Sequence, residues 1–390
     1  MGLNLSFTKS RLFKIFVIFL GIYLFVCALT GFKDSWVMLF AIGGEESMAR
    51  RLIGGVVQNP FAALFAGILA TSLIQSSSAT VAITIAMVAA GGITISQSVP
   101  LIMGANIGTT VTSTIVSMAY AFRKAEFAKV VPATLVHDMF KFYNVAIFFV
   151  LELSFQFLSR IAASISSLME GMPLVGGFLN GFPDFLDILT APVVNPMISV
   201  IINTLGETPS AALMLGVASF ILLAYGLKIM SDAVRDLTEA QADHLLKKAF
   251  KNPKRSLLVG FSLCWILQSS SVATSLVIPF VAAGVVKLKE VYHYAMGAAL
   301  GTTCDAGQII SYLKFGIIGL SVGLVHILLN FFGVIIFSFV PVLKDLPLTS
   351  AEKIGDFIVQ SKRGAILFIF LVVSIFYILP LLVIILGGGL

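Results

Sequence analysis

The sequence predicts an all-helical, polytopic membrane protein whose core is two inverted-topology repeats, each with a re-entrant or broken helical hairpin. Of its 390 residues, 58% are hydrophobic and 11% are charged, whereas a soluble domain has about 25% charged residues. No charged side chain occurs between Arg51 and Arg123. The tetrad Gln-Ser-Ser-Ser occurs twice, at 75–78 and at 268–271. This composition excludes a soluble globular protein and a disordered chain.

Further charge-free runs each have about the length of one membrane-spanning helix, which is about 20 residues. They are Ile15–Phe32, Thr208–Leu227, Ser256–Val286, Phe315–Leu343 and Gly364–Leu390. The first run has basic flanks, but no small-residue cleavage site follows Gly31. It therefore indicates an uncleaved first span and not a signal peptide.

The net charge of +6 does not indicate a nucleic-acid partner. The basic residues gather in predicted loops such as 247–255, as the positive-inside rule expects for a membrane protein. The three cysteines, Cys27, Cys264 and Cys304, lie in or beside apolar segments without metal-ligand spacing. They are interpreted as structural thiols, and no cofactor is expected beyond a coupling ion.

An internal repeat is visible at a constant offset of 193 residues. Five separated motifs keep this offset, which chance similarity between apolar helices does not explain. The first copies are Asn59-Pro60, Gly67, Gln75–Ser78, Ala89–Gly91, and Gly104-Ala105 with Gly108–Thr110. A later match, Leu135–His137 against Leu324–His326, has an offset of 189.

Loop charge predicts that the two repeats have opposite orientations. The basic N-terminal tail is placed in the cytoplasm, whereas 152–210 holds one arginine and five acidic residues and is predicted to be an external loop. Its apolar, proline-interrupted stretch Ile188–Leu205 is expected at the interface or against the bundle. One span, roughly Ala211–Met230, then leads to a basic cytoplasmic segment at 232–255. Opposed repeats of this kind are typical of secondary transporters.

These expectations divide the chain into six parts. They are an N-terminal tail with the first span and an external segment (1–54), the first repeat (55–151), the external loop (152–210), the linking helix and basic segment (211–255), the second repeat (256–345) and a C-terminal transmembrane helix (346–390).

Each tetrad places four polar side chains inside an apolar run. An unsatisfied amide or hydroxyl in hydrocarbon costs several kcal/mol. A lone serine would be interpreted as helix-packing glue, but the same tetrad at two equivalent positions favours a binding site. Flanking glycines at 91–92, 104, 284 and 297 fit two half-helices that meet near mid-membrane. Serine hydroxyls, glutamine amides and free backbone N–H groups suit an oxyanion.

The Gly-Thr-Thr elements add oxygen ligands of the kind that hard cations prefer. One copy offers Asn106, Thr109, Thr110 and Thr112, and the other offers Thr302, Thr303 and Asp305. Close helix packing at Gly104 and Gly108 is the alternative interpretation. Because the long run contains no carboxylate, sodium is favoured over a proton relay. Co-bound sodium would offset the cost of burying a dianion, since no lysine or arginine is available in that run.

The first motif set resembles the first repeat of the type II sodium/phosphate cotransporter family. It reads Gln75-Ser-Ser-Ser-Ala-Thr80, Gly104-Ala-Asn-Ile-Gly-Thr-Thr110 with Val111–Val116, and Val136-His137-Asp138. The second set resembles the second repeat, with Gln268–Ser275, Gly297–Thr303, His326 and Asn330-Phe331-Phe332. The likeness covers roughly residues 55–150 and 205–345.

The resemblance implies sodium-driven uptake of inorganic phosphate by alternating access in a multi-pass protein of the cell membrane (the bacterial inner membrane), with a cytoplasmic N-terminus. It implies phosphate contacts at Ser76, Ser77, Ser78, Ser269, Ser270, Ser271, Asn106 and Thr109. It implies sodium ligands at Gln75, Thr80, Thr110, Gln268, Ser271, Thr274, Thr302, Thr303 and Asp305. The oligomeric state is left open.

The sequence also departs from that family. Arg123 stands where some members have an acidic residue linked to an additional sodium, and Ala299 replaces the usual asparagine. Asp305 stands where a threonine is common, which makes it a candidate charged sodium ligand. The loop 152–210 has no cysteine, so the disulfide of animal relatives is absent.

Two alternatives stay open. The first is a sodium symporter for another small anion, such as sulfate or arsenate. The second is an intramembrane hydrolase that uses Ser76 or Ser269, but the sequence offers no strained strand-to-helix elbow for a nucleophile, so an enzyme is not expected. The pair His137-Asp138 is instead interpreted as structural, with a bond from His137 or His326 to a neighbouring helix. Asp138 and Lys141, one helical turn apart, are expected to pair.

Overall fold

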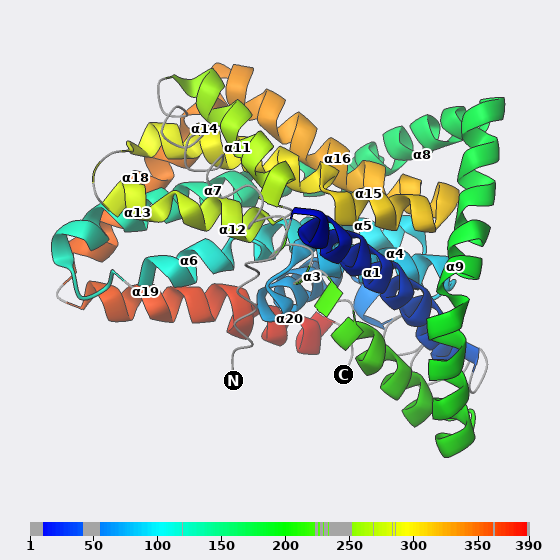
Figure 1. The fold of residues 1–390 in the computed structure, drawn as a ribbon. Helices are drawn as coiled ribbons and strands as arrows, with labels where there is room; N and C mark the ends of the chain where they lie inside the picture. Colours follow the sequence, from blue (N-terminus) through cyan, green and yellow to red (C-terminus); the bar gives the residue numbers. More distant parts are fainter. Residues whose placement is uncertain are drawn as a thin grey trace.

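The computed structural model describes residues 11–41, 55–118, 120–222, 225, 226, 229, 233, 252–267, 269–282, 284, 286–361 and 363–387. Within these ranges the chain is helical and contains no strand (Figure 1). Six helical stretches of the described residues are long and apolar enough to cross a membrane. They are Phe13–Leu39, Ile95–Met118, Lys124–Phe155, Asp187–Leu205, Gly316–Phe339 and Gly364–Gly387. The protein is therefore an all-helical, multi-pass membrane protein.

The first repeat region consists of α3 (Pro60–Ile74), α4 (Ser77–Ala89), α5 (Ile95–Gly108), α6 (Val111–Met118) and α7 (Lys124–Phe155). Local chemistry explains where its helices begin. Asn59 caps α3, whose first residue is a proline, and the Thr94 and Gln97 side chains form a capping box at the start of α5. Gly91, with φ of +71°, supplies the left-handed turn between α4 and α5.

The second repeat region consists of α11 (Pro253–Leu267), α12 (Ser270–Leu276), α13 (Ile278–Ala282), α14 (Leu288–Gly301), a 3-10 turn (Thr302–Cys304), α15 (Ala306–Lys314) and α16 (Gly316–Phe339). Like the first, it begins with an asparagine followed by a proline. The Asn252 side-chain oxygen accepts the backbone N–H of Arg255 at 2.8 Å at the start of α11. Gly284, with φ of +74°, takes the left-handed conformation of Gly91.

Two helix pairs pack through glycines at corresponding positions. A Cβ added to Gly67 would collide with the Leu101 carbonyl, and one added to Gly104 would collide with the Leu64 carbonyl, so α3 and α5 approach at backbone distance. The pair α11 and α14 makes the corresponding contacts through Gly260 and Gly297. Such small-residue contacts are a usual way for helices to associate in a membrane.

Residues 152–210, which the sequence predicts to be an external loop, contain two helices. The amphipathic α8 (Phe157–Glu170) begins where Glu152 accepts the Leu158 N–H at 2.8 Å, and α9 (Pro173–Leu205) runs for 33 residues along one edge of the molecule (Figure 1). The prolines inside α9 do not end it, although each proline lacks the N–H that would close a backbone hydrogen bond of the helix. The side of the membrane on which this segment lies stays a prediction.

The apolar stretch of α9 has one packed side and one exposed side. Thr190 is buried and its hydroxyl lies 3.1 Å from that of Thr30 on α1 (Arg11–Ala41). Asp187 forms an ion pair with Lys314 of α15 at 2.5 Å. Ile188 is 74% exposed. The stretch therefore packs against the bundle on one face, and its other face is apolar.

The C-terminal part holds more than the single transmembrane helix expected for 346–390. After the short α17 (Pro341–Lys344), α18 (Leu346–Gln360) packs on α7, where Gly355 faces the Pro132 ring. The span itself comprises α19 (Gly364–Val373), a π-helical turn (Ser374–Ile378) and α20 (Leu379–Gly387). The π turn lies just before Pro380, which lacks an N–H and would clash with the carbonyl four residues earlier.

The linking helix is described over Pro209–Leu222, which is apolar but shorter than the six candidate spans. Most of the basic segment 232–255 and the N-terminal tail before Arg11 lie outside the described residues.

The packing of α3 against α5 yields a first prediction. Gly104→Ala should lower the free energy of unfolding of the detergent-solubilised protein by about 1–3 kcal/mol, and with it the melting temperature, because the added methyl group must push α3 away from α5. Differential scanning fluorimetry would measure the change. Gly171→Ala is the matched control, since the nearest atoms to its Cβ are 3.6 Å away. Equal stability of the two variants would contradict the close approach.

Candidate functional site

The first tetrad lies at a break between two helices, as its sequence predicts. Gln75 adopts the left-handed conformation, with φ of 57°, and ends α3. Ser76 is extended and caps α4, accepting the Ala79 N–H on its hydroxyl at 3.2 Å. Ser77 is buried and Ser78 is half-buried in the first turn of α4. A helix start leaves backbone N–H groups without intrahelical partners, so this break combines free donors with three hydroxyls.

The second tetrad has the same local geometry. Ser269 is extended and caps α12, accepting the Val272 N–H at 3.2 Å. Ser270 is buried and Ser271 is half-buried. Gln268 lies outside the described residues, so its predicted role has no structural counterpart here. The two serine caps, Ser76 and Ser269, are separated by the repeat offset.

Asp305 joins the two repeat regions. The Ser78 hydroxyl donates to Oδ2 of Asp305 at 3.0 Å, so the first tetrad meets the second Gly-Thr-Thr element. Asp305 also caps α15, because its Oδ1 accepts the Gln308 N–H at 2.8 Å. The Gln308 side-chain amide is fully buried and has no hydrogen-bond partner among the described residues. Both the Asp305 carboxylate and the Gln308 amide are buried.

The predicted threonine ligands point their hydroxyl protons at backbone carbonyls. Thr80, Thr109, Thr110, Thr274 and Thr303 donate to the carbonyls of Ser76, Ala105, Ile107, Ser270 and Leu300, respectively, at 2.7–3.1 Å. Thr302 instead accepts from the Cys264 thiol at 3.5 Å. All six threonines are buried. A hydroxyl whose proton is engaged still has lone pairs, which is the state in which it can ligate a cation.

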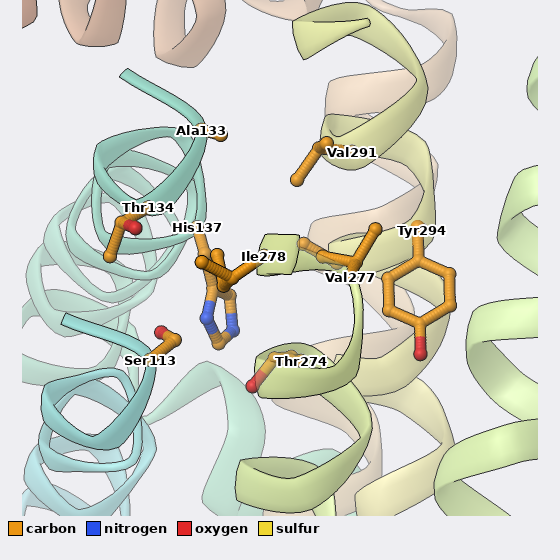
Figure 2. Close-up of a pocket in the computed structure, with 10 residues that line it drawn as sticks. Ser113, Ala133, Thr134, His137, Thr274, Val277, Ile278, Val291 and Tyr294 are labelled. Atoms are coloured by element: carbon orange, nitrogen blue, oxygen red, sulfur yellow. The ribbon is translucent and has the colours of Figure 1, made fainter. Parts of the chain in front are cut away.

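A small cavity of about 10 Å³ lies between helices of the two repeat regions. Its volume is close to the space that one water molecule needs. Ser113, Thr134 and His137 line it from α6 and α7, and Thr274 and Tyr294 line it from α12 and α14 (Figure 2). Its lining includes one predicted sodium ligand, Thr274, and none of the tetrad serines.

The structure thus brings some predicted residues together and leaves others separate. Ser78 contacts Asp305, and Asn106 lies on α5 one turn before Thr109 and Thr110. Among the described residues, no hydrogen bond joins one tetrad to the other. The first tetrad contacts the second repeat region through the hydrogen bond from Ser78 to Asp305.

The expected pairing of Asp138 with Lys141 is wrong. The Asp138 carboxylate accepts the Thr114 hydroxyl at 3.4 Å. Lys141 instead donates to the side-chain oxygens of Asn106, at 2.6 Å, and Asn330, at 2.9 Å. Sequence reasoning missed this cluster because its partners are distant along the chain.

The interpretation of the histidines as structural has partial support. His326 of α16 shares a 3.4 Å hydrogen bond with the Tyr312 hydroxyl of α15. Nδ1 of His137 is buried without a hydrogen-bond partner among the described residues.

Comparison with known proteins shows the family of the chain. The family model described as Na+/Pi-cotransporter matches residues 24–176 and 222–361. The chain is 26% identical to the sodium-dependent phosphate transport protein 2A of Rattus norvegicus over 97% of this chain and 68% of the relative. Its identity to the 2C protein of the same species is 28%, over 74% of this chain and 59% of the relative.

The human sodium-dependent phosphate transport protein 2B is 23% identical, over 94% of this chain and 64% of the relative. The chain thus spans about two thirds of the length of these relatives. No solved structure matches. Since the family model covers both repeat regions and well over half of the sequence, the chain belongs to the Na+/Pi-cotransporter family, which is a family of membrane transporters and not of enzymes.

Proposed function

We propose that the protein couples inward sodium movement to the uptake of inorganic phosphate by alternating access. The observation that carries this proposal is the hydrogen bond from Ser78 to Asp305, which links a helix break of one repeat to the Gly-Thr-Thr element of the other. Two sequence-related halves that share one buried polar region are the arrangement on which rocking or sliding carriers depend.

The two repeats would have opposite orientations in the bilayer. The equivalent glycine contacts of α3 with α5 and of α11 with α14 support two copies of one unit. The basic N-terminal tail and the acidic 152–210 segment support their inversion, with the N-terminus in the cytoplasm. The cell membrane, in a bacterium the inner membrane, is the proposed location.

Phosphate would bind to the serine hydroxyls of both tetrads, Ser76–Ser78 and Ser269–Ser271, with Asn106 and Thr109 beside the first. The hydroxyl oxygens of Ser76 and Ser269 accept backbone N–H groups as helix caps. The hydroxyl proton of each serine therefore stays available to donate to an anion. Neutral donors of this kind orient an oxyanion without holding it irreversibly. A carrier requires that property, because the ligand must leave on the other side of the membrane.

Sodium would bind to the oxygens of the Gly-Thr-Thr elements and of Gln75, Thr80, Gln268, Ser271 and Thr274. Their proton-engaged hydroxyls and the Asp305 carboxylate form an oxygen-rich set. Cation and anion then stabilise each other, and by reciprocity each raises the affinity of the other. Each net positive charge that moves inward gains about 2.3 kcal/mol per 100 mV of membrane potential.

Uptake of labelled phosphate into proteoliposomes tests the proposal. An inward sodium gradient should drive accumulation, an equal potassium gradient should not, and unlabelled sulfate should compete poorly. Phosphate accumulation that does not depend on the sodium gradient would count against sodium–phosphate coupling. Loss of phosphate accumulation in the presence of an equal concentration of sulfate would also count against it.

Removal of one tetrad hydroxyl should impair transport. Ser77→Ala and Ser270→Ala should each lower the ratio of the maximal uptake rate to the half-saturating phosphate concentration at least tenfold, which is about 1.4 kcal/mol. Each variant removes a buried hydrogen-bond donor to the anion. Ser164→Ala, on the exposed face of α8, is the matched control and should transport normally. Normal uptake by both tetrad variants would remove these serines from the site.

The Asp305 carboxylate should set sodium affinity. Asp305→Asn should raise the half-saturating sodium concentration roughly tenfold, because it removes one negative charge from the oxygen set, while maximal uptake at high sodium is largely kept. Asp356→Asn, an exposed carboxylate on α18, is the control. Unchanged sodium affinity in Asp305→Asn would show that this carboxylate is only a helix cap.

A further inference from the structure

A buried ammonium lies between the two repeat regions. Lys141 of α7 is 1% exposed, and its Nζ donates to Oδ1 of Asn106 on α5 at 2.6 Å and to Oδ1 of Asn330 on α16 at 2.9 Å. It forms no ion pair with a carboxylate of the described residues. A charge that is buried without a counter-ion is costly, and polar groups of this kind inside a membrane protein usually serve its function.

The ligands of this ammonium are those that an alkali cation would take. Both are neutral amide oxygens, and they come from separate helices that converge on one point. An ammonium group has three donors, and two of them are used. No third hydrogen bond from Nζ is formed among the described residues, which leaves one N–H of the ammonium for another acceptor.

The repeat shows that this charge is an asymmetric addition. With the offset of 189 that relates His137 to His326, Lys141 corresponds to Asn330. The second copy therefore has an amide where the first copy has an ammonium. Lys141 thus supplies a positive charge on one side of the repeat that its equivalent on the other side, Asn330, does not.

The Lys141 contact also orients Asn106. Both polar atoms of the Asn330 side chain have a partner, because its Nδ2 donates to the His326 carbonyl at 3.0 Å and its Oδ1 accepts from Lys141. The Asn106 amide is engaged only through its oxygen, and its Nδ2 is buried without a hydrogen-bond partner among the described residues. Held in this way, Asn106 presents two N–H donors from the end of α5, next to Thr109 and Thr110. Unpaired buried donors beside a cation are suited to an anion.

We propose that Lys141 is a built-in cation that takes the place of one sodium ion at the anion site. This inference rests on the proposed sodium–phosphate coupling. The ammonium neutralises part of the charge of the phosphate and returns with the empty carrier, so each phosphate needs one sodium ion fewer. A neutral side chain at position 141 would restore an oxygen-lined place for sodium between Asn106 and Asn330.

Equilibrium binding of ²²Na+ to the purified protein in saturating phosphate tests the proposal. Lys141→Asn, which copies the equivalent residue of the second repeat, should bind one more sodium per chain than the unmodified protein. Lys141→Gln should do the same and serves as the second variant if Lys141→Asn does not fold. Lys141→Arg keeps the charge and should keep the original number. Lys353→Asn, at an exposed position on α18, is the control for loss of a lysine.

A transport measurement gives a second readout. In proteoliposomes, Lys141→Asn should show a steeper dependence of phosphate uptake on sodium and should move one more positive charge per phosphate. Equal sodium counts and equal charge movement in both neutral variants would overturn the proposal and leave Lys141 as a brace between α5, α7 and α16. Absence of sodium-dependent uptake in the unmodified protein would instead overturn the proposed function, whereas the binding count does not depend on transport.

Discussion

Every feature of the site depends on one constraint, which is that a helix broken inside an apolar region must find partners for its freed polar groups. Ser76 and Ser269 meet this constraint locally by capping the helix that follows each break. Ser78 meets it at long range through Asp305. Because hydrocarbon offers no alternative partner, the Ser78–Asp305 contact favours the joining of the two repeat regions. Ions and a phosphate that bind there would take over some of these contacts, which is how binding could be coupled to movement.

The sequence was sufficient to predict the helix breaks, because four consecutive polar residues in an apolar run cannot all face lipid and the repeat supplied a second instance. It also predicted the first span and the helical class. The long helix α9 was missed because its prolines were interpreted as breaks. A proline inside a helix removes one backbone hydrogen bond, but α9 continues through its prolines on the remaining ones.

The charges near the site were the least predictable part. Spacing along one helix favoured a pair between Asp138 and Lys141, whereas the fold gives Lys141 two amide partners that are 35 and 189 residues away. No local pattern encodes such contacts, since they arise only when α5, α7 and α16 converge. The sequence favoured sodium alone as the counter-charge of the anion, because Lys141 lies outside the charge-free run between Arg51 and Arg123. The buried ammonium changes the charge balance and connects the proposed phosphate ligand Asn106 to the second repeat.

The central claim is that the serine tetrads of both repeats bind one shared anion. An experimental structure in saturating sodium and arsenate, with the anomalous signal of arsenic used to locate the anion, tests it most directly. The account predicts a single arsenic peak within hydrogen-bonding reach of Ser77 and of Ser270. A peak that contacts only one tetrad, or an anion bound away from both, would contradict it.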